Sequence, residues 1–167
     1  MSFICPICHQ THDELPDIGS DRPTQYWDVA EEERDRRVKL TGDTCEIDGQ
    51  HFFIRGVIKI PIHGDPDGFG FGVWVSQKEE NYRTYLANFD SAEIGPFFGW
   101  LCTQISYYTE DTQSLKTTAF FNADGLRPHI KLHDAEQHPL AIDQRNGISL
   151  ERAWEIVHFY TKPEDLT

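Results

Sequence analysis

The stretch 51–63, HFFIRGVIKIPIH, constrains the fold of this 167-residue chain more than any other feature. Its even positions are apolar apart from one glycine, and they carry Phe52, Ile54, Gly56, Ile58, Ile60 and Ile62. Successive side chains of a strand point to opposite faces, so this period predicts a long strand with one buried and one mixed face. The turn sequence GDPDG at 64–68 and the alternating run FGFGVWVS at 69–76 then predict an antiparallel hairpin.

The remaining elements are predicted from shorter patterns. Apolar runs at 96–105, 115–121 and 129–132 indicate three more strands. Helices are expected in three places, which are 29–40 after Asp28, 77–89 with Ser76 as its cap, and a last segment that begins at Ser149. We therefore expect an α+β protein whose sheet is mostly antiparallel, with about five strands and two or three helices.

Length and charge limit the functions that need to be considered. The chain fits a single domain over 1–167, without a repeat or a linker. It has 28 Asp and Glu against 15 Lys and Arg, a formal net charge of −13. Nucleic-acid and anionic-membrane binding need a basic surface, so this charge argues against both. It is compatible with a basic protein partner, and an immunity-type role against a basic toxin is one form of that hypothesis. It does not predict the oligomeric state.

Two further patterns argue for a cytoplasmic protein. Polar residues from Gln10 to Glu14 come too early for the apolar part of a secretory signal. The most apolar stretch, 52–62, is interrupted by Arg55 and Lys59 and is too short to span a bilayer. In the cytoplasm thiols stay reduced, so closely spaced cysteines favour metal binding or catalysis over a disulfide.

The first residues, MSFICPICHQTH, predict a zinc site. Cys5 and Cys8 have the C-x₂-C spacing of the commonest two-ligand zinc clamp, and His12 can fold back onto the same ion. His9 is the alternative to His12. A buried non-metal pair and a redox pair are the competing interpretations, but a redox pair would need to start a helix after a strand.

The fourth ligand is predicted to be Cys45, in a segment that we expect to be a loop leading into the long strand. Residues 1–15 and the loop 43–48 would then form an N-terminal zinc knuckle. Cys102, in the middle of an apolar run, is expected to be a packed strand residue. Four protein ligands leave no open position for water, so the Zn²⁺ would be structural.

Several stretches together resemble one bacterial family, the domain of unknown function DUF2199. The resemblance rests on the Cys5-x-x-Cys8-x₃-His12 start and on DTCEIDGQHFFIRG at 43–56, GVWVSQKEEN at 72–81, PFFGWL at 96–101, SLKT at 114–117 and HPLAIDQRNGISLERAWEI at 138–156. It covers nearly the whole chain. The family has no established activity, so the resemblance implies a bacterial, intracellular protein and no particular reaction.

A second group of residues suggests a binding surface. Arg55 and Lys59 share the mixed face of the long strand, and Trp74 and Trp100 are predicted to lie on the corresponding faces of their strands. Together they would form a concave patch of aromatic rings and cations, suited to an acidic or carboxylate group. The alternative is a solvated sheet face on which Arg55 pairs with an acidic side chain.

The segment HPLAIDQRNG adds His138 and Arg145 as binding candidates. His138 could act as a general base, cap a helix or bond a backbone carbonyl. No nucleophile stands out, and no catalytic residue is assigned.

The leading hypothesis is a zinc-stabilised binding module. The alternative is a small hydrolase-like enzyme with a pocket around Arg55, Trp74, Trp100 and His138, and a structural or regulatory subunit is the third possibility.

Overall fold

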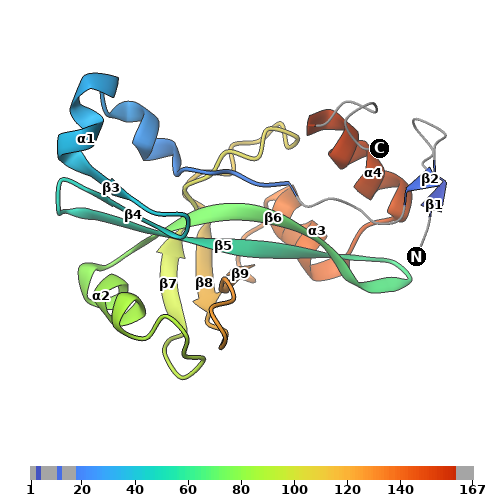
Figure 1. Cartoon of the computed structure of the whole chain (residues 1–167). Helices are drawn as coiled ribbons and strands as arrows, with labels where there is room; N and C mark the ends of the chain where they lie inside the picture. The colour runs from blue at the N-terminus through green and yellow to red at the C-terminus, as the bar shows by residue number, and fades with distance from the viewer. Residues whose placement is uncertain (1–2, 5–10, 13–17, 161–167) are drawn as a thin grey trace.

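The computed structural model describes residues 3–4, 11–12 and 18–160 (Figure 1). In chain order its elements are β1 (Phe3–Ile4), β2 (Thr11–His12), η1 (Thr24–Asp28), η2 (Glu31–Glu33), α1 (Arg34–Arg37), β3 (Val38–Leu40), β4 (Thr44–Ile47), β5 (His51–Ile62), β6 (Asp65–Gln77), α2 (Glu79–Ala87), β7 (Phe97–Trp100), β8 (Lys116–Phe120), β9 (His129–Leu132), α3 (Pro139–Asn146) and α4 (Leu150–Tyr160). The predicted α+β class is confirmed. Among the described helices, none has the length and apolar character needed to cross a membrane.

The predicted hairpin is confirmed. Strand β5 pairs with β6 in antiparallel fashion, in a register that runs from Phe52 opposite Gln77 to Ile60 opposite Phe69. The even positions of β5 form the buried face, where Ile54 and Ile60 are fully buried. The alternation in the sequence therefore identified the buried face correctly, because the period of a strand directly reports its two sides.

The sheet as a whole corrects the prediction of a mostly antiparallel sheet with about five strands. Within residues 18–160, seven strands form a mixed sheet in the order β3-β4-β5-β9-β8-β7, and β6 also pairs with β5. Strand β9 runs parallel to β5, with Val57 opposite His129. Hydrophobic period reports the buried face of a strand but not its neighbours, so the return of β9 to β5 could not be predicted.

The sheet curls until β7 meets β6. Leu101 forms an antiparallel bridge with Val75, and the Cys102 N–H donates to the Trp74 carbonyl over 2.8 Å. The Gln77 amide also donates to the carbonyl of Phe98, over 3.1 Å. These bonds join the end of the hairpin to the far end of the sheet.

Two glycines permit the close approaches that this curl requires. A Cβ at Gly56 would lie 2.6 Å from Cγ1 of Ile130 and 2.8 Å from the Pro128 carbonyl oxygen, at the junction of β5 and β9. A Cβ at Gly99 would meet the Ser76 carbonyl oxygen and lie 2.9 Å from Nε2 of Gln77, at the junction of β6 and β7. Any larger residue would have to push the strands apart.

Two hydrophobic clusters lie on opposite faces of the β5–β6 hairpin. The larger one contains the apolar even positions of β5 together with buried residues of α2, α3, α4, β8 and β9. The smaller one consists of Val29, Cys45, Ile47, Phe53, Trp74 and Cys102. Burial raises the pKa of the Cys45 and Cys102 thiols to about 11. Both cysteines are packed residues of the smaller cluster.

The charged segment after Asp28 is mostly not helical, which corrects the prediction of a helix over 29–40. Only Arg34–Arg37 forms an α-helix, and Val38–Leu40 is the edge strand β3. Arg37 forms a two-point ion pair with Asp48, which lies in the turn after β4, with both N–O distances 2.8 Å. This long-range pair and the β3–β4 hydrogen bonds outweigh the local i,i+4 pairs, each worth about 0.5 kcal/mol or less.

The other helix predictions are closer. Helix α2 forms inside the predicted range 77–89, but the Ser76 hydroxyl accepts from the Trp100 N–H, over 3.1 Å, instead of capping it. Ser149 caps α4 as predicted, since its hydroxyl accepts from the Arg152 N–H over 3.1 Å. Helix α3 was not predicted. It begins at Pro139, which suits a first helical turn because proline has no N–H to satisfy there.

Candidate functional site

The predicted aromatic wall of Trp74 and Trp100 is not formed. Trp74 is fully buried, and its indole N–H donates to the Ser20 carbonyl over 2.9 Å. Trp100, on β7, has 44% of its surface exposed. The segment before η1 pairs with the edge of β6, where the Ile18 N–H bonds the Gly70 carbonyl, and Trp74 packs within the smaller hydrophobic cluster.

His138 and Arg145 have structural roles on α3. His138 is the N-cap, where Nδ1 accepts from the Leu140 N–H over 3.0 Å and Nε2 lies 3.1 Å from the Glu110 carbonyl oxygen. Arg145 donates to the carbonyl oxygens of Glu136 and, at longer range, of residue 134. Of the three roles considered for His138, helix capping and carbonyl bonding are both observed, and both ring nitrogens contact backbone groups.

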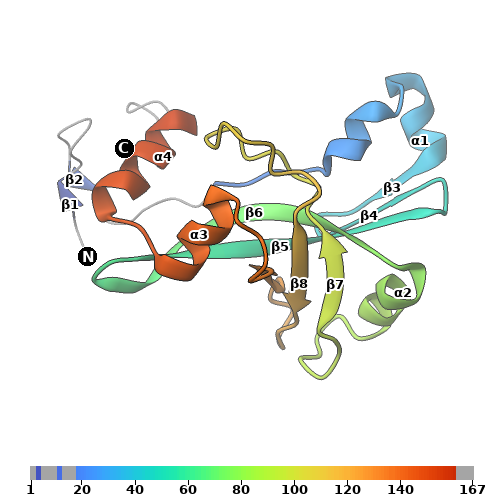
Figure 2. The same ribbon diagram turned by 180° about the vertical axis from the view of Figure 1, so that it is seen from behind.

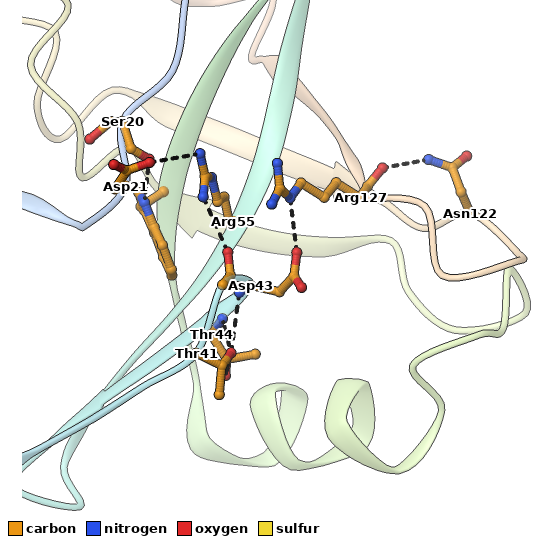
Figure 3. A network of polar contacts seen from close by, with 10 residues as sticks. Ser20, Asp21, Thr41, Asp43, Thr44, Arg55, Asn122 and Arg127 are labelled. Carbon is orange, nitrogen blue, oxygen red and sulfur yellow. Dashed lines mark hydrogen bonds and ion pairs between the residues drawn. The ribbon is translucent and has the colours of Figure 1, made fainter.

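Arg55 lies opposite Trp74 of β6, on the side of β5 that faces away from the larger hydrophobic cluster. Its guanidinium contacts Asp21 over 3.4 Å and the Gly42 carbonyl oxygen over 3.3 Å. Arg127 lies just before β9 and forms an ion pair with Asp43 over 2.9 Å (Figure 3). Asp43 follows Gly42 in the loop between β3 and β4. The two arginines therefore lie side by side, although they are far apart in the sequence.

The parallel pairing of β9 with β5 extends this row of cations. Because Val57 lies opposite His129, Lys131 falls at the level of Lys59 on the same face of the sheet. His129, Lys131 and Lys59 are all exposed. On β8, Lys116 also points outward and lies opposite Trp100 of β7.

Three exposed aromatic rings lie among these cations. Phe98, Trp100 and Phe120 keep 41%, 44% and 43% of their surface exposed, although they stand on regular strands. The ring of Phe98 packs edge-on against Trp100, with centroids 5.0 Å apart, and against His133, with centroids 5.5 Å apart. Such apolar exposure on the surface of a sheet commonly marks an interaction site.

We call this surface the outer face. It is formed by the exposed or partly exposed residues Lys59, Phe98, Trp100, Lys116, Thr118, Phe120, His129, Lys131 and His133. The outward positions of β7, β8 and β9 contain no Asp or Glu, in a chain that has 28 of them. Acidic side chains reach this face from the segment after β9, where Glu136 accepts from the backbone N–H of Lys116 over 3.0 Å and Asp134 lies 4.0 Å from the Lys131 ammonium.

Two cavities adjoin the outer face at Trp100. The larger has a volume of about 590 Å³ and includes Gln50, His51, Gln77 and Ser114 in its lining. The smaller, about 490 Å³, extends past Gln77 toward Lys78, Asn81 and Phe98. Their polar lining is largely amide and hydroxyl groups, which suit recognition better than acid–base chemistry.

The small-enzyme alternative named four pocket residues, and Trp100 alone among them lines either cavity. Trp100 and Arg55 were predicted as binding residues from the sequence, whereas Lys116, Phe120 and Lys131 were not. The sequence did contain a pattern that could have identified them, since the alternation in LKTTAFF and HIKL separates outward-facing from inward-facing residues. What could not be seen was that their outward sides form one surface with that of β5.

The predicted zinc ligands are only partly described. Cys5, Cys8 and the alternative ligand His9 lie outside the described residues, whereas His12 belongs to β2 and pairs with Phe3 of β1. Cys45 belongs to β4 and not to a loop, and it is fully buried. Strands β1 and β2 lie near one end of the β5–β6 ribbon and β4 near the other (Figure 1, Figure 2). Among the described residues, no group of three or more His, Cys, Asp or Glu side chains is arranged to hold a metal ion.

Comparison with known proteins gives one positive finding. Neither the curated proteins nor the solved structures contain a match to the chain. A family model described as an uncharacterised protein conserved in bacteria matches residues 4–148, which include every strand from β2 to β9 and helix α3. The chain therefore belongs to the DUF2199 family, as the resemblance in its sequence predicted.

Proposed function

We propose that the protein is a non-catalytic binding module that takes an acidic polypeptide segment on the outer face. The observation that carries this proposal is the combination of exposed rings and exposed cations on strands β7, β8 and β9, whose outward positions include no Asp or Glu. Aromatic anchors surrounded by charged groups are the usual composition of a protein-binding surface.

Charge complementarity favours an acidic partner at this place. The net charge of −13 opposes an acidic partner at long range. At physiological salt, however, charges are screened beyond about 8 Å, so the local cations dominate once the partner is in contact. Lys59, Lys116 and Lys131 would then face its carboxylates.

The rings would supply the apolar part of the affinity. Phe98, Trp100 and Phe120 remain about two-fifths exposed and would bury this surface under a partner. Trp100 also borders the larger cavity, which gives a bulky side chain of the partner a place to insert.

Two other partners are less well supported. A basic protein partner is compatible with the net charge, but the lysines of the outer face would repel it, so it would bind elsewhere. Single-stranded nucleic acid also stacks on aromatic rings of sheets. However, the few cations here are a weak source of counterion release in a chain with this net charge.

The test uses poly-L-glutamate, labelled with fluorescein and followed by fluorescence anisotropy at two salt concentrations. Wild type should bind it, and the double variant Lys116→Glu, Lys131→Glu should bind at least about tenfold more weakly, because two attractive contacts become repulsive. The matched control is Arg36→Glu, Lys39→Glu, which changes the net charge equally at exposed positions outside the outer face. It should retain most of the affinity.

Poly-L-lysine and oligo(dT) serve as competing probes. Tight binding of poly-L-lysine with no binding of poly-L-glutamate would favour the basic partner instead. Binding of oligo(dT) that is lost in the Lys116, Lys131 variant would identify the outer face as a nucleic-acid surface. Either result would overturn the proposal.

We also propose that Zn²⁺ is bound by Cys5, Cys8 and His12, with a structural role. The pairing of His12 with Phe3 supports this grouping, because it brings His12 back to the chain just before Cys5. The structure gives no such support to Cys45, whose thiol is buried among Phe53 and Trp74. The assignment of Cys45 as the fourth ligand stays a prediction.

Metal analysis of protein purified without added zinc should find about one Zn²⁺ per chain, and Cys5→Ser, Cys8→Ser should remove it. Cys102→Ala is the control, because it removes a buried thiol that is not in the predicted ligand set. Cys45→Ala decides the fourth position, since retained zinc would exclude Cys45. Wild-type protein without metal would contradict the whole site.

A further inference from the structure

The guanidinium of Arg55 has unusually few good partners for a buried charge. Its side chain is only 14% exposed. Its two hydrogen bonds, to Asp21 and to the Gly42 carbonyl oxygen, are 3.4 and 3.3 Å long, beyond the common range for such bonds. Nε is buried, and none of the described residues accepts a hydrogen bond from it.

This arrangement is costly unless an acceptor is supplied. A guanidinium has five N–H donors, and buried polar groups in folded proteins are normally satisfied. Asp21 compensates this cost only weakly, because its side chain is 81% exposed and exposed ion pairs contribute little to stability. Asp21 does show that a carboxylate reaches Arg55 from the solvent side.

Arg127 provides a second guanidinium at the same place. Its Nε donates to Asp43, the residue next to Gly42, so one short loop positions both arginines. The loop itself is held by the Thr41 hydroxyl, which accepts from the N–H groups of residues 43 and 44. Figure 3 shows the two guanidinium groups side by side above this loop.

We propose that Arg55 and Arg127 form a binding site for an oxyanion, a carboxylate or a phosphate group. Two planar guanidinium groups match the paired oxygens of such groups and form charge-assisted hydrogen bonds with them. Asp21 occupies part of the site when it is empty and moves into solvent when the anion enters. The site does not depend on the acidic partner proposed above, because it would bind a free anion even without that partner.

The test measures thermal unfolding while inorganic phosphate or malonate replaces chloride at constant ionic strength. An anion that binds only the folded state raises the midpoint by an amount that grows with the logarithm of its concentration once that concentration exceeds Kd. Wild type should show this rise. Asp21→Asn should bind the anion several-fold more tightly, because it removes the internal competitor.

Arg127→Gln should weaken the apparent affinity about tenfold, as expected for the loss of one charge-assisted contact. Arg127 is 41% exposed at its side chain, so this variant should fold even if a change at the buried Arg55 does not. Arg36→Gln is the control, since it removes an equally charged but distant and exposed group. Its titration should match that of wild type.

The proposal is overturned if phosphate and malonate stabilise wild type and Asp21→Asn no more than chloride does, or if Arg127→Gln leaves the titration unchanged. This failure is distinct from failure of the outer face. Poly-L-glutamate binding that depends on Lys116 and Lys131 would survive it, and anion binding at Arg127 would survive the loss of polypeptide binding. If phosphate binds and malonate does not, the site is specific for phosphate groups.

Discussion

Gly56→Val is expected to lower the free energy of unfolding by about 3 kcal/mol, which is at the upper end for overpacking a core. The new Cβ would lie 2.6 Å from Cγ1 of Ile130 and 2.8 Å from the Pro128 carbonyl oxygen. The second contact involves backbone, which cannot rotate away. Valine would therefore separate β9 from β5 and break the parallel pairing on which the curl of the sheet depends.

Urea unfolding followed by circular dichroism measures this loss from the midpoint and slope. Gly42→Val is the matched control, because a Cβ there has nothing within 4 Å, and its effect should stay within about 0.5 kcal/mol. Gly56→Ala keeps the test informative if the valine variant does not fold, since its Cβ alone makes the same contacts. Equal stabilities at positions 42 and 56 would contradict the packing at the β5–β9 junction.

Asp143→Ala is the second substitution with a large expected effect. Asp143, on α3, is 6% exposed and accepts from the Tyr108 hydroxyl over 2.6 Å and from the Arg152 guanidinium. Burial and the bond to Asp143 raise the pKa of Tyr108. Removing the carboxylate would leave a buried hydroxyl and a cation without their partner. The expected loss is about 3 kcal/mol, the low end for a broken buried pair, because the Arg152 side chain remains 35% exposed.

The same urea measurement tests this value. Asp143→Asn keeps an oxygen for the Tyr108 hydroxyl and should lose less than the alanine variant. Asp134→Ala removes an 80% exposed carboxylate from its long pair with Lys131, and it should cost less than about 0.5 kcal/mol. A loss at Asp143 as small as that at Asp134 would mean that the buried network contributes little to stability.

The accuracy of the sequence predictions followed the range of the interactions involved. The β5–β6 hairpin and the α4 cap at Ser149 were predicted correctly because period, turn residues and caps act over a few positions. The prediction of a helix over 29–40 was wrong because it relied on i,i+4 charge pairs, which are local and weak. Arg37 keeps its local pair with Glu33 but also pairs with Asp48, which no local pattern reveals.

The candidate site divides in the same way. The chemistry expected of it, aromatic rings with cations suited to an acidic group, describes the outer face well. The predicted residues were only partly correct, because Trp74 is buried and therefore forms no surface that connects Trp100 with Arg55. Lys116, Phe120 and Lys131 complete the surface, and each lies on a strand whose outward side was readable from its alternation.

The α+β class, the buried face of each long strand, the membership of the DUF2199 family and the excess of acidic residues could all be read from the order of the amino acids. The parallel return of β9 to β5, the hydrogen bond from the Trp74 indole to the Ser20 carbonyl and the gathering of lysines and exposed rings on one side of the sheet became visible in the folded chain alone. This division arises because the hydrophobic period of a strand depends on its own residues. Its neighbours depend on close approaches between distant segments, such as the one that Gly56 permits, and these are selected by the packing of the whole chain.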